Sequence, residues 1–184
     1  MDAPTAFRQQ LLGAIPRLRR YARSLVFDST AADDLVQTAL ERALSHWHQF
    51  DQRRDLLVWT ISIVHNAFVD ERRRSARMSV VEPADGDASP DAHLDRWGSD
   101  PGSDIGLRID LLAALRSLPT EQREVLLLVS VEQFTYAECA EALAIPIGTV
   151  MSRVSRARVA LRALLDGRAP AASSSGAATL RRVV

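Results

Sequence analysis

Residues 144–165 read AIPIGTVMSRVSRARVALRALL, a short turn followed by a long helical repeat. Pro146 and Gly148 mark the turn, and the apolar residues beyond it recur every three or four positions, as in a helix with one buried face. These apolar residues are Val150, Val154, Ala157, Leu161 and Leu164. The other faces carry small hydroxyl side chains and arginines, so the helix is suited to approach an anionic partner.

The segment before this turn predicts a second, shorter helix. Thr135 and Glu138 have the spacing of a capping box, which opens a helix that extends to Leu143. A short capped helix, a tight turn over residues 144–148 and a longer basic helix form the pattern of a helix-turn-helix, whose second helix enters the major groove of DNA. The alternative interpretation is an amphipathic helix with a solvated cationic face.

The face opposite the apolar residues holds the DNA-binding candidates. A helix turns about 100° per residue, so with Val154 at the centre of the buried face the polar side chains lie on the far side and its flanks. The candidates are Thr149, Met151, Ser152, Arg153, Ser155, Arg156 and Arg158. Small side chains let a helix approach base edges, whereas arginines further along neutralise phosphates.

The whole chain predicts an all-α fold of two small helical domains. Helical periodicity covers residues 7–26, 31–47, 56–74 and 105–131, and strand patterns are nearly absent. Residues 1–77 predict an N-terminal helical domain. Residues 105–168 predict a C-terminal domain that contains the helix-turn-helix.

The composition changes sharply in residues 78–104. Between Ser79 and Asp104 there are seven acidic residues and one basic residue, Arg96, together with several prolines and glycines. Apolar residues are too sparse here to offset the entropy of ordering, so the segment is expected to be a flexible acidic linker. Residues 169–184 are rich in Ala, Ser and Gly and predict a disordered tail.

The overall composition indicates the cellular compartment of the protein but not its binding partner. The 23 basic residues, all of them arginine, balance 23 acidic residues, so net charge predicts no partner. The single cysteine, Cys139, forms no disulfide within the chain and suits a reducing compartment. No apolar run approaches the roughly 18 residues of a membrane span, so we expect a cytoplasmic protein without membrane insertion.

Patterns that indicate catalysis are missing from the sequence. His46 and His48 are two residues apart and do not share a helix face, and no other Cys or His completes metal-ligand spacing. No glycine-rich phosphate loop is present. We therefore expect no enzyme, no metal and no cofactor.

Residues 111–165 resemble the C-terminal domain of bacterial extracytoplasmic-function (ECF) sigma factors, members of the sigma-70 family. The shared pattern is a leucine-rich helix, the pair LP, an EQRE start, the helix FTYAECA and then PIGTVMSRVSRAR. The segments AADDLVQTALERAL and FDQRRDLLVWTISIVHNAFVDERRR resemble the family's polymerase-docking and promoter-melting stretches. Together the resemblance covers about residues 7–77 and 105–166, on either side of a variable linker.

The resemblance implies that the second helix binds the beta-prime clamp helices of RNA polymerase core. The positions that match the family's core-binding residues are Asp33, Asp34, Leu35, Val36, Gln37 and Arg42. Apolar side chains for burial, flanked by charges that set orientation, suit a protein interface. Thr38 stands where the family usually has an acid.

The resemblance also implies that residues 50–77 capture the non-template strand of the minus-ten element. Flipped bases need pockets and stacking partners, and the exposed strand needs cations. The implied minus-ten residues are Phe50, Arg53, Arg54, Asn66, Arg72, Arg73, Arg74 and Arg77. His65 and Thr60 depart from the family's usual arginine and leucine, and Met151 departs from a basic residue in the helix that would read the minus-thirty-five element.

On this reading the protein is an ECF sigma factor that joins polymerase core, recognises promoter DNA and is controlled by an anti-sigma factor. The family's linker threads the RNA channel of the polymerase, and the acidic segment is either such an insert or a soluble tether. Two alternatives remain: a stand-alone helix-turn-helix regulator, and a sigma mimic that titrates an anti-sigma factor.

Overall fold

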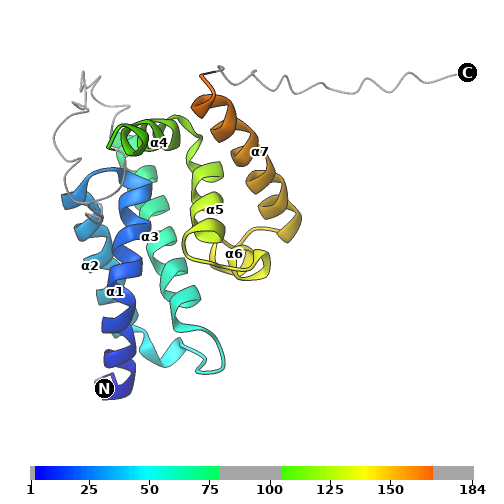
Figure 1. Ribbon diagram of the computed structural model, residues 1–184. Coiled ribbons are helices and arrows are strands. Elements are labelled where there is room, and N and C mark those ends of the chain that lie inside the picture. Colours follow the sequence, from blue (N-terminus) through cyan, green and yellow to red (C-terminus); the bar gives the residue numbers. More distant parts are fainter. Residues whose placement is uncertain (1–2, 79–104, 168–184) are drawn as a thin grey trace, which may run out of the picture.

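The computed structural model describes residues 3–78 and 105–167, and every regular element in these ranges is a helix. The helices are α1 (Thr5–Val26), α2 (Ser29–Ser45), the short 3₁₀ helix η1 (Trp47–Gln49), α3 (Leu56–Met78), α4 (Ile105–Ser117), α5 (Thr120–Ser130), α6 (Tyr136–Ala142) and α7 (Ile147–Leu165). Figure 1 shows α1, α2 and α3 side by side, with α5 between α3 and α7 and α4 across one end. The all-α prediction is confirmed. The expected linker beyond Met78 and the expected tail lie outside the described residues.

The N-terminal half is a three-helix bundle. Leu18, Tyr21 and Ala22 of α1 pack against Leu35 and Val36 of α2 and against the apolar face of α3. A satellite cluster at the start of α1 holds Phe7 and Leu11 against the partly buried Trp59. α1 continues through Pro16 without ending, and it terminates at Phe27, which adopts a left-handed conformation with φ of 54°.

The C-terminal half is the expected helix-turn-helix with two supporting helices. Val150, Val154 and Ala157 of α7 are buried, as the sequence period predicts, and Leu161 and Leu164 pack against a cluster shared with α4 and α5. α6 begins with the predicted capping box: the Thr135 side chain accepts from the Glu138 backbone N–H, and the Glu138 carboxylate accepts from the Thr135 N–H. The capped helix α6 and the buried face of α7 therefore hold α7 in a fixed orientation.

Local geometry sets the helix boundaries, and the turn before α7 differs from the sequence expectation. Asp28 caps α2, because its carboxylate accepts from the Ala31 N–H at 2.7 Å. Thr120 is the first residue of α5, and Pro119 precedes it with φ already fixed near the helical value. In the turn before α7 the left-handed residue is Ala144, with φ of 52°, and Gly148 lies inside the helix.

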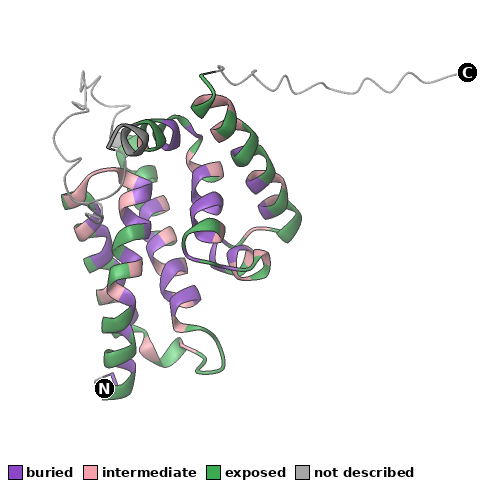
Figure 2. Cartoon of the chain, viewed as in Figure 1, coloured by how far each residue is buried: buried purple, intermediate pink, exposed green. Residues whose placement is uncertain are grey.

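The two halves share one core, which the sequence did not predict. Buried residues of α1, α2 and α3 form a single cluster with Val125 and Leu128 of α5, Cys139 of α6 and Val150 of α7. Figure 2 shows the buried positions concentrated where α3 and α5 face each other. The structure is therefore a closed arrangement in which the N-terminal bundle covers one side of the C-terminal half.

Within the described residues, no helix is long and apolar enough to cross a membrane. The same ranges contain no group of three or more His, Cys, Asp and Glu side chains arranged to hold a metal ion.

Candidate nucleic-acid interfaces

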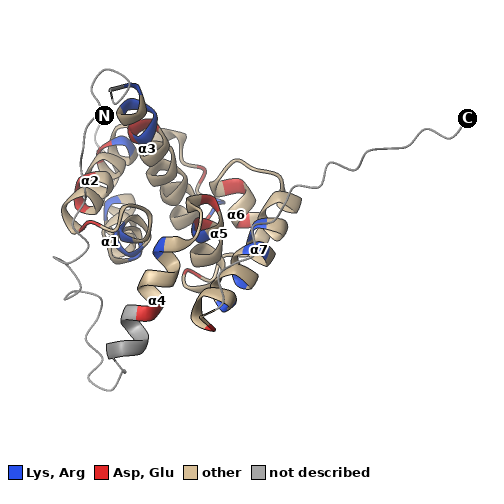
Figure 3. Ribbon diagram, turned by 90° about the horizontal axis from the view of Figure 1, so that it is seen from above, with Lys and Arg blue, Asp and Glu red and all other residues tan. Residues whose placement is uncertain are grey.

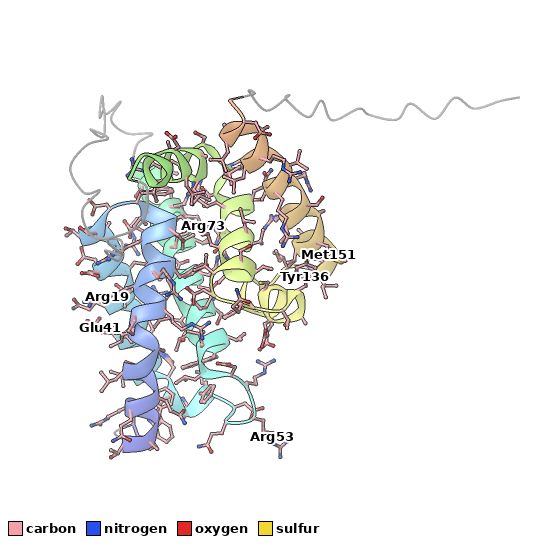
Figure 4. All side chains as sticks on the ribbon, viewed as in Figure 1. Arg19, Glu41, Arg53, Arg73, Tyr136 and Met151 are labelled. Carbon is pink, nitrogen blue, oxygen red and sulfur yellow. The ribbon has the colours of Figure 1, made fainter. Side chains whose placement is uncertain are left out.

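The outer face of α7 presents the side chains that the sequence assigned to DNA. Ser155, Arg156 and Arg158 are exposed, and Met151 is 53% exposed at the start of the helix. Figure 4 shows Met151 projecting from α7 on the side away from α1. Thr149 is half-buried. The exposed side chains of this face are thus accessible to a partner.

A short hydrogen-bond chain orders this face. The Ser152 hydroxyl donates to the Thr149 carbonyl at 3.0 Å, and Arg156 donates to the carbonyl and hydroxyl of Ser152 at 3.3 and 3.2 Å. The guanidinium of Arg156 therefore lies back along the helix, toward the turn that a major groove would receive. Holding it there reduces the entropy lost when it binds a base edge or a phosphate.

Arg153 differs from the other arginines of α7 because it has a partner inside the fold. Its Nη2 lies 2.6 Å from Oε2 of Glu121 on α5, and its side chain is only 21% exposed. It also lines a hollow of about 490 Å³, together with Arg72 and Arg73 of α3. The structure thus brings a predicted minus-thirty-five residue next to two predicted minus-ten residues.

The second candidate interface is a small pocket of about 330 Å³ between α2, η1 and α3. Asn66 is exposed at its edge, and Trp59 forms part of its wall. The pocket is lined by Arg42, His46, Gln49, Trp59, Ser62, Ile63 and Asn66. One aromatic face beside several hydrogen-bonding groups is the chemistry that holds an unpaired nucleobase.

The aromatic wall is fixed from behind. The Phe50 and Trp59 rings lie 5.3 Å apart between centroids, and Phe7 packs against both, at 5.9 Å from Phe50 and 6.1 Å from Trp59. Phe50 and Trp59 are accordingly only partly exposed. Phe50 therefore supports the pocket from the loop, and Trp59 serves both the core and the pocket wall.

The loop before α3 carries the two predicted loop arginines in different environments. Arg53 is exposed at the tip of the loop, as Figure 4 shows. Arg54 reaches the other half of the protein, where its Nη1 lies 3.2 Å from Oε1 of Glu141 on α6. The Asp55 carboxylate accepts from the Leu57 N–H at 2.6 Å and fixes the start of α3.

The C-terminal end of α3 is basic and largely exposed. Arg72 stacks over the Phe68 ring at 5.7 Å, and Arg74 pairs with Glu71 at 2.7 Å. Arg73 and Arg77 are exposed. Figure 3 shows basic residues at this end of α3 and along α7.

The residues expected to bind polymerase divide into exposed and buried members. On α2, Asp34 and Gln37 are exposed, whereas Leu35 and Val36 are 8% and 3% exposed and belong to the shared core. Asp33 pairs with Arg19 at 3.1 Å, and Arg42 with Asp70 at 3.3 Å. Leu35 and Val36 therefore anchor α2, and the surface that α2 offers a partner is mainly polar.

Sequence reasoning missed the partners of these residues. Glu121 and Glu141 pair with Arg153 and Arg54 from other helices, and no spacing in the sequence indicates such long-range pairs. Thr60 and His65, two departures from the family pattern, face inward: Thr60 is 1% exposed, and His65 Nδ1 lies 2.6 Å from Glu124. The described geometry gives neither residue a direct position at the DNA surface.

Two family models match this chain, one in its C-terminal half and one in its N-terminal half. Sigma-70, region 4, matches residues 108–161, and the Sigma2 domain of PhyR matches residues 11–65. The ECF RNA polymerase sigma factor EcfG of Rhodopseudomonas palustris (strain TIE-1) is 38% identical over 166 residues, which cover 90% of this chain and 88% of that protein. This chain belongs to the ECF sigma factors.

Solved structures of family members have the same fold. The sigma factor RpoE of Bartonella quintana, in complex with the anti-sigma factor NepR, aligns with a TM-score of 0.77 and 33% identity over 89% of this chain and 98% of that one. The anti-anti-sigma factor PhyR, complexed with NepR from the same organism, aligns with a TM-score of 0.52 and 18% identity over 84% of this chain and 48% of that one, which shows a shared fold alone.

Proposed function

We propose that this ECF sigma factor binds RNA polymerase core and directs it to promoters through the two interfaces described above. The observation that carries the proposal is that one chain holds both a base-sized pocket edged by Asn66 and, in its other half, a helix-turn-helix with an exposed polar face. A stand-alone regulator needs only the second. A chain that melts DNA needs both, because the melted strand must be captured at a distance from the duplex that is read.

In this proposal the pocket receives one flipped base of the minus-ten element. The amide of Asn66 both donates and accepts, so it can pair with a base edge, while Trp59 offers a stacking face. Gln49 and Ser62 line the same pocket and add further hydrogen-bonding groups. Arg72, Arg73 and Arg77 then follow the phosphates of the same strand.

The polymerase is proposed to dock on the exposed face of α2. Asp34 and Gln37 project from it, and Glu41 accepts from the Gln37 amide at 3.0 Å, which holds the row in place. An acidic, partly preordered helix face suits a partner that offers basic side chains, here the beta-prime clamp helices.

An anti-sigma factor is the proposed regulator. RpoE of Bartonella quintana was solved with its anti-sigma factor, and this chain aligns with almost the whole of that protein. By similarity, a NepR-like protein is the first candidate to test as the partner. We place the protein in the cytoplasm, where its polymerase partner is found.

The test is co-elution of the purified chain with bacterial polymerase core, followed by transcription of genomic DNA from its own host. Co-elution with new, discrete transcript starts is expected. The Arg156→Ala variant serves as the matched control, because it should co-elute and yet lose promoter-specific starts. Absence of co-elution would contradict the proposal and support the alternative, a stand-alone DNA-binding regulator.

A sigma mimic is the second candidate. It is favoured by the match of residues 11–65 to the Sigma2 domain of PhyR, a protein described in its solved structure as an anti-anti-sigma factor. A mimic would bind a NepR-like protein and show no co-elution with core. The retention of Asn66 and of the exposed α7 arginines argues against it, since a mimic has no use for them.

A further inference from the structure

Three charged side chains of the C-terminal half are buried against the N-terminal bundle. Arg123 and Glu124 of α5, and Glu132 just after it, are 3–4% exposed. Charged side chains are rarely this buried unless they are paired, and here each has a partner on the other half of the chain. Arg123 also donates to three carbonyls of its own half, those of Leu115, Arg116 and Leu118. Their burial therefore depends on the closed arrangement.

Glu132 is held by two arginines of α1. Arg17 Nε lies 2.7 Å from one carboxylate oxygen and Arg20 Nε lies 2.6 Å from the other. The pairing raises the pKa of Arg20, because the hydrogen bond to Glu132 favours the charged guanidinium. Both arginines are about two-fifths exposed, so they belong to the surface of α1 and reach over Glu132 from its rim.

Glu124 joins three helices at one carboxylate. Its Oε1 accepts a hydrogen bond from the Tyr21 hydroxyl of α1 and lies 2.6 Å from His65 Nδ1 of α3. Tyr21 is 1% exposed. A single carboxylate of α5 is thus the point at which the C-terminal half attaches to two helices of the N-terminal bundle.

Arg123 closes the end of α1. Its Nε donates to the Ser24 carbonyl at 2.9 Å and its Nη2 to the Leu25 carbonyl at 3.3 Å, and its guanidinium stacks over the Phe27 ring at 4.5 Å. The last carbonyls of a helix carry partial negative charge, so a cation is favoured there. This contact supplies from α5 a cationic partner for the last carbonyls of α1.

The closed arrangement cannot serve a promoter. The minus-ten and minus-thirty-five elements are about 25 base pairs apart, which is about 85 Å at roughly 3.4 Å per base pair. A helix as long as α3, with 23 residues, spans only about 35 Å. Since α3 packs against α6 and α7 packs against both α5 and α6, their DNA-binding faces are too close together to occupy both elements at once.

Closure also engages two residues proposed to bind DNA. Arg54 pairs with Glu141 across the interface, and Arg153 lines the hollow that Arg72 and Arg73 enter from α3. The 26 residues between the two halves, 79–104, correspond to a fully extended chain length of at most about 90 Å. This length is enough for the two halves to reach both promoter elements.

We propose that the contacts of Arg123, Glu124 and Glu132 with α1 and α3 form a latch that holds the free chain closed, and that the latch opens before the chain occupies both promoter elements. The requirement that the latch open on a promoter rests on the proposed function, whereas the latch itself is a property of the free protein. A polar latch suits reversible opening, because buried ion pairs lose in desolvation much of what they gain in attraction and are rehydrated when separated. Polymerase and promoter then act by binding the open state more tightly than the closed one.

The experiment measures the distance between spin labels at Ser45→Cys on α2 and Val159→Cys on α7, in a Cys139→Ala background. Both label sites are exposed and lie outside the proposed interfaces. The free protein should give one short distance. Arg17→Glu combined with Arg20→Glu places three carboxylates together and should shift most of the population to long distances, and adding Glu132→Arg should restore the short one.

Arg19→Glu is the matched control, because Arg19 pairs with Asp33 within the N-terminal bundle and should leave the distance unchanged. A long distance in the parent protein, or a short distance in the folded Arg17→Glu, Arg20→Glu variant, would overturn the latch. Far-ultraviolet circular dichroism and urea melting show that each variant keeps its helices. With core polymerase added, the opened variant should bind several-fold more tightly; if neither protein binds core, the proposed function fails while the distance result stands.

Discussion

Arg153 of α7 and Glu121 of α5 form an ion pair with 2.6 Å between Nη2 and Oε2, so one arginine of the recognition helix is turned toward its own domain. Its neighbours Arg156 and Arg158 are exposed. The arginines of one helix are therefore not equivalent, although the sequence presents them as a uniform basic run. For Arg153 to bind a phosphate it must leave Glu121, which is 67% exposed and weakly held.

Glu121→Gln should therefore raise DNA affinity. Removing the carboxylate frees Arg153 to bind a phosphate, so we expect a gain in affinity of a few-fold and a salt dependence steeper by up to about one unit in log K against log salt. Promoter-fragment titrations with the holoenzyme at several salt concentrations measure both quantities. Arg153→Ala should show the reverse change in slope, and an unchanged slope in both variants would mean that the pair is purely structural.

Arg156→Ala should reduce promoter-specific transcription about tenfold or more while leaving core binding intact. Arg156 is exposed and already ordered against Ser152, and a lost arginine–base contact costs about 1–3 kcal/mol. Run-off transcription and core co-elution are measured on the same preparation. Arg162→Ala, an exposed arginine farther from the turn, is the matched control. Equal loss of transcription and core binding in Arg156→Ala would assign the helix a structural role.

Asn66→Ala should weaken capture of the melted strand without changing duplex binding. Asn66 sits at the rim of the base-sized pocket and makes no contribution to the core, so the fold should be unaffected. A lost base contact is expected to cost about 1–3 kcal/mol. Permanganate footprinting of open complexes, next to gel-shift of a duplex minus-thirty-five fragment, separates the two steps. Ser75→Ala, on the exposed end of α3, is the control.

Charged substitutions at Leu35 should unfold the N-terminal bundle, not simply release polymerase. Leu35 is 8% exposed within the shared core, and a buried unpaired charge costs several kcal/mol. Asp34→Arg tests docking cleanly, because Asp34 is exposed: it should reduce core binding at unchanged urea stability. Loss of core binding by Leu35→Asp at unchanged stability would show that Leu35 itself reaches the polymerase.

The contrast between Leu35, which is buried, and Asp34, which is exposed, shows what the sequence alone could not predict. Periodicity and caps predicted the helices, the helix-turn-helix and the buried face of Val150, Val154 and Ala157, because these features depend on residues a few positions apart. The pairs Arg20–Glu132 and Arg54–Glu141 join residues roughly 90 to 110 positions apart, and only the three-dimensional packing of the two halves creates them. Leu35 and Val36 fit both a core and an interface, and burial alone distinguishes the two.

The single thiol should be inert while the protein is folded. Cys139 is fully buried, and burial, reinforced by the nearby Glu138 and Glu124, raises its pKa to about 12. Because the thiolate is the reactive form, alkylation near neutral pH should be at least a hundredfold slower than for the unfolded chain. Mass spectrometry after brief exposure to iodoacetamide, with and without urea, measures this. Rapid labelling of the folded chain would contradict the described burial.

Tyr21 gives the closed interface a defined response to alkaline pH. Burial, with Glu124 beside it, raises the pKa of the Tyr21 phenol well above its ordinary value of 10.0. A phenol whose pKa is higher in the folded state contributes stability that is fully present below pH 10 and is lost as the pH rises from 10 through the raised value. Between pH 10 and the raised value the folded phenol stays protonated and keeps its hydrogen bond to Glu124, and stability falls because the phenol of the unfolded chain ionises.

Tyr21→Phe isolates this contribution. At about pH 8 the variant should be less stable by roughly 1–3 kcal/mol, because Glu124 loses a buried donor. The difference between the two proteins should then shrink steadily above pH 10, since only the parent has a phenol to ionise. Urea unfolding of both proteins at matched pH values measures the difference. If it stayed constant across that range, the Tyr21 hydroxyl would not be held by Glu124 in the closed protein.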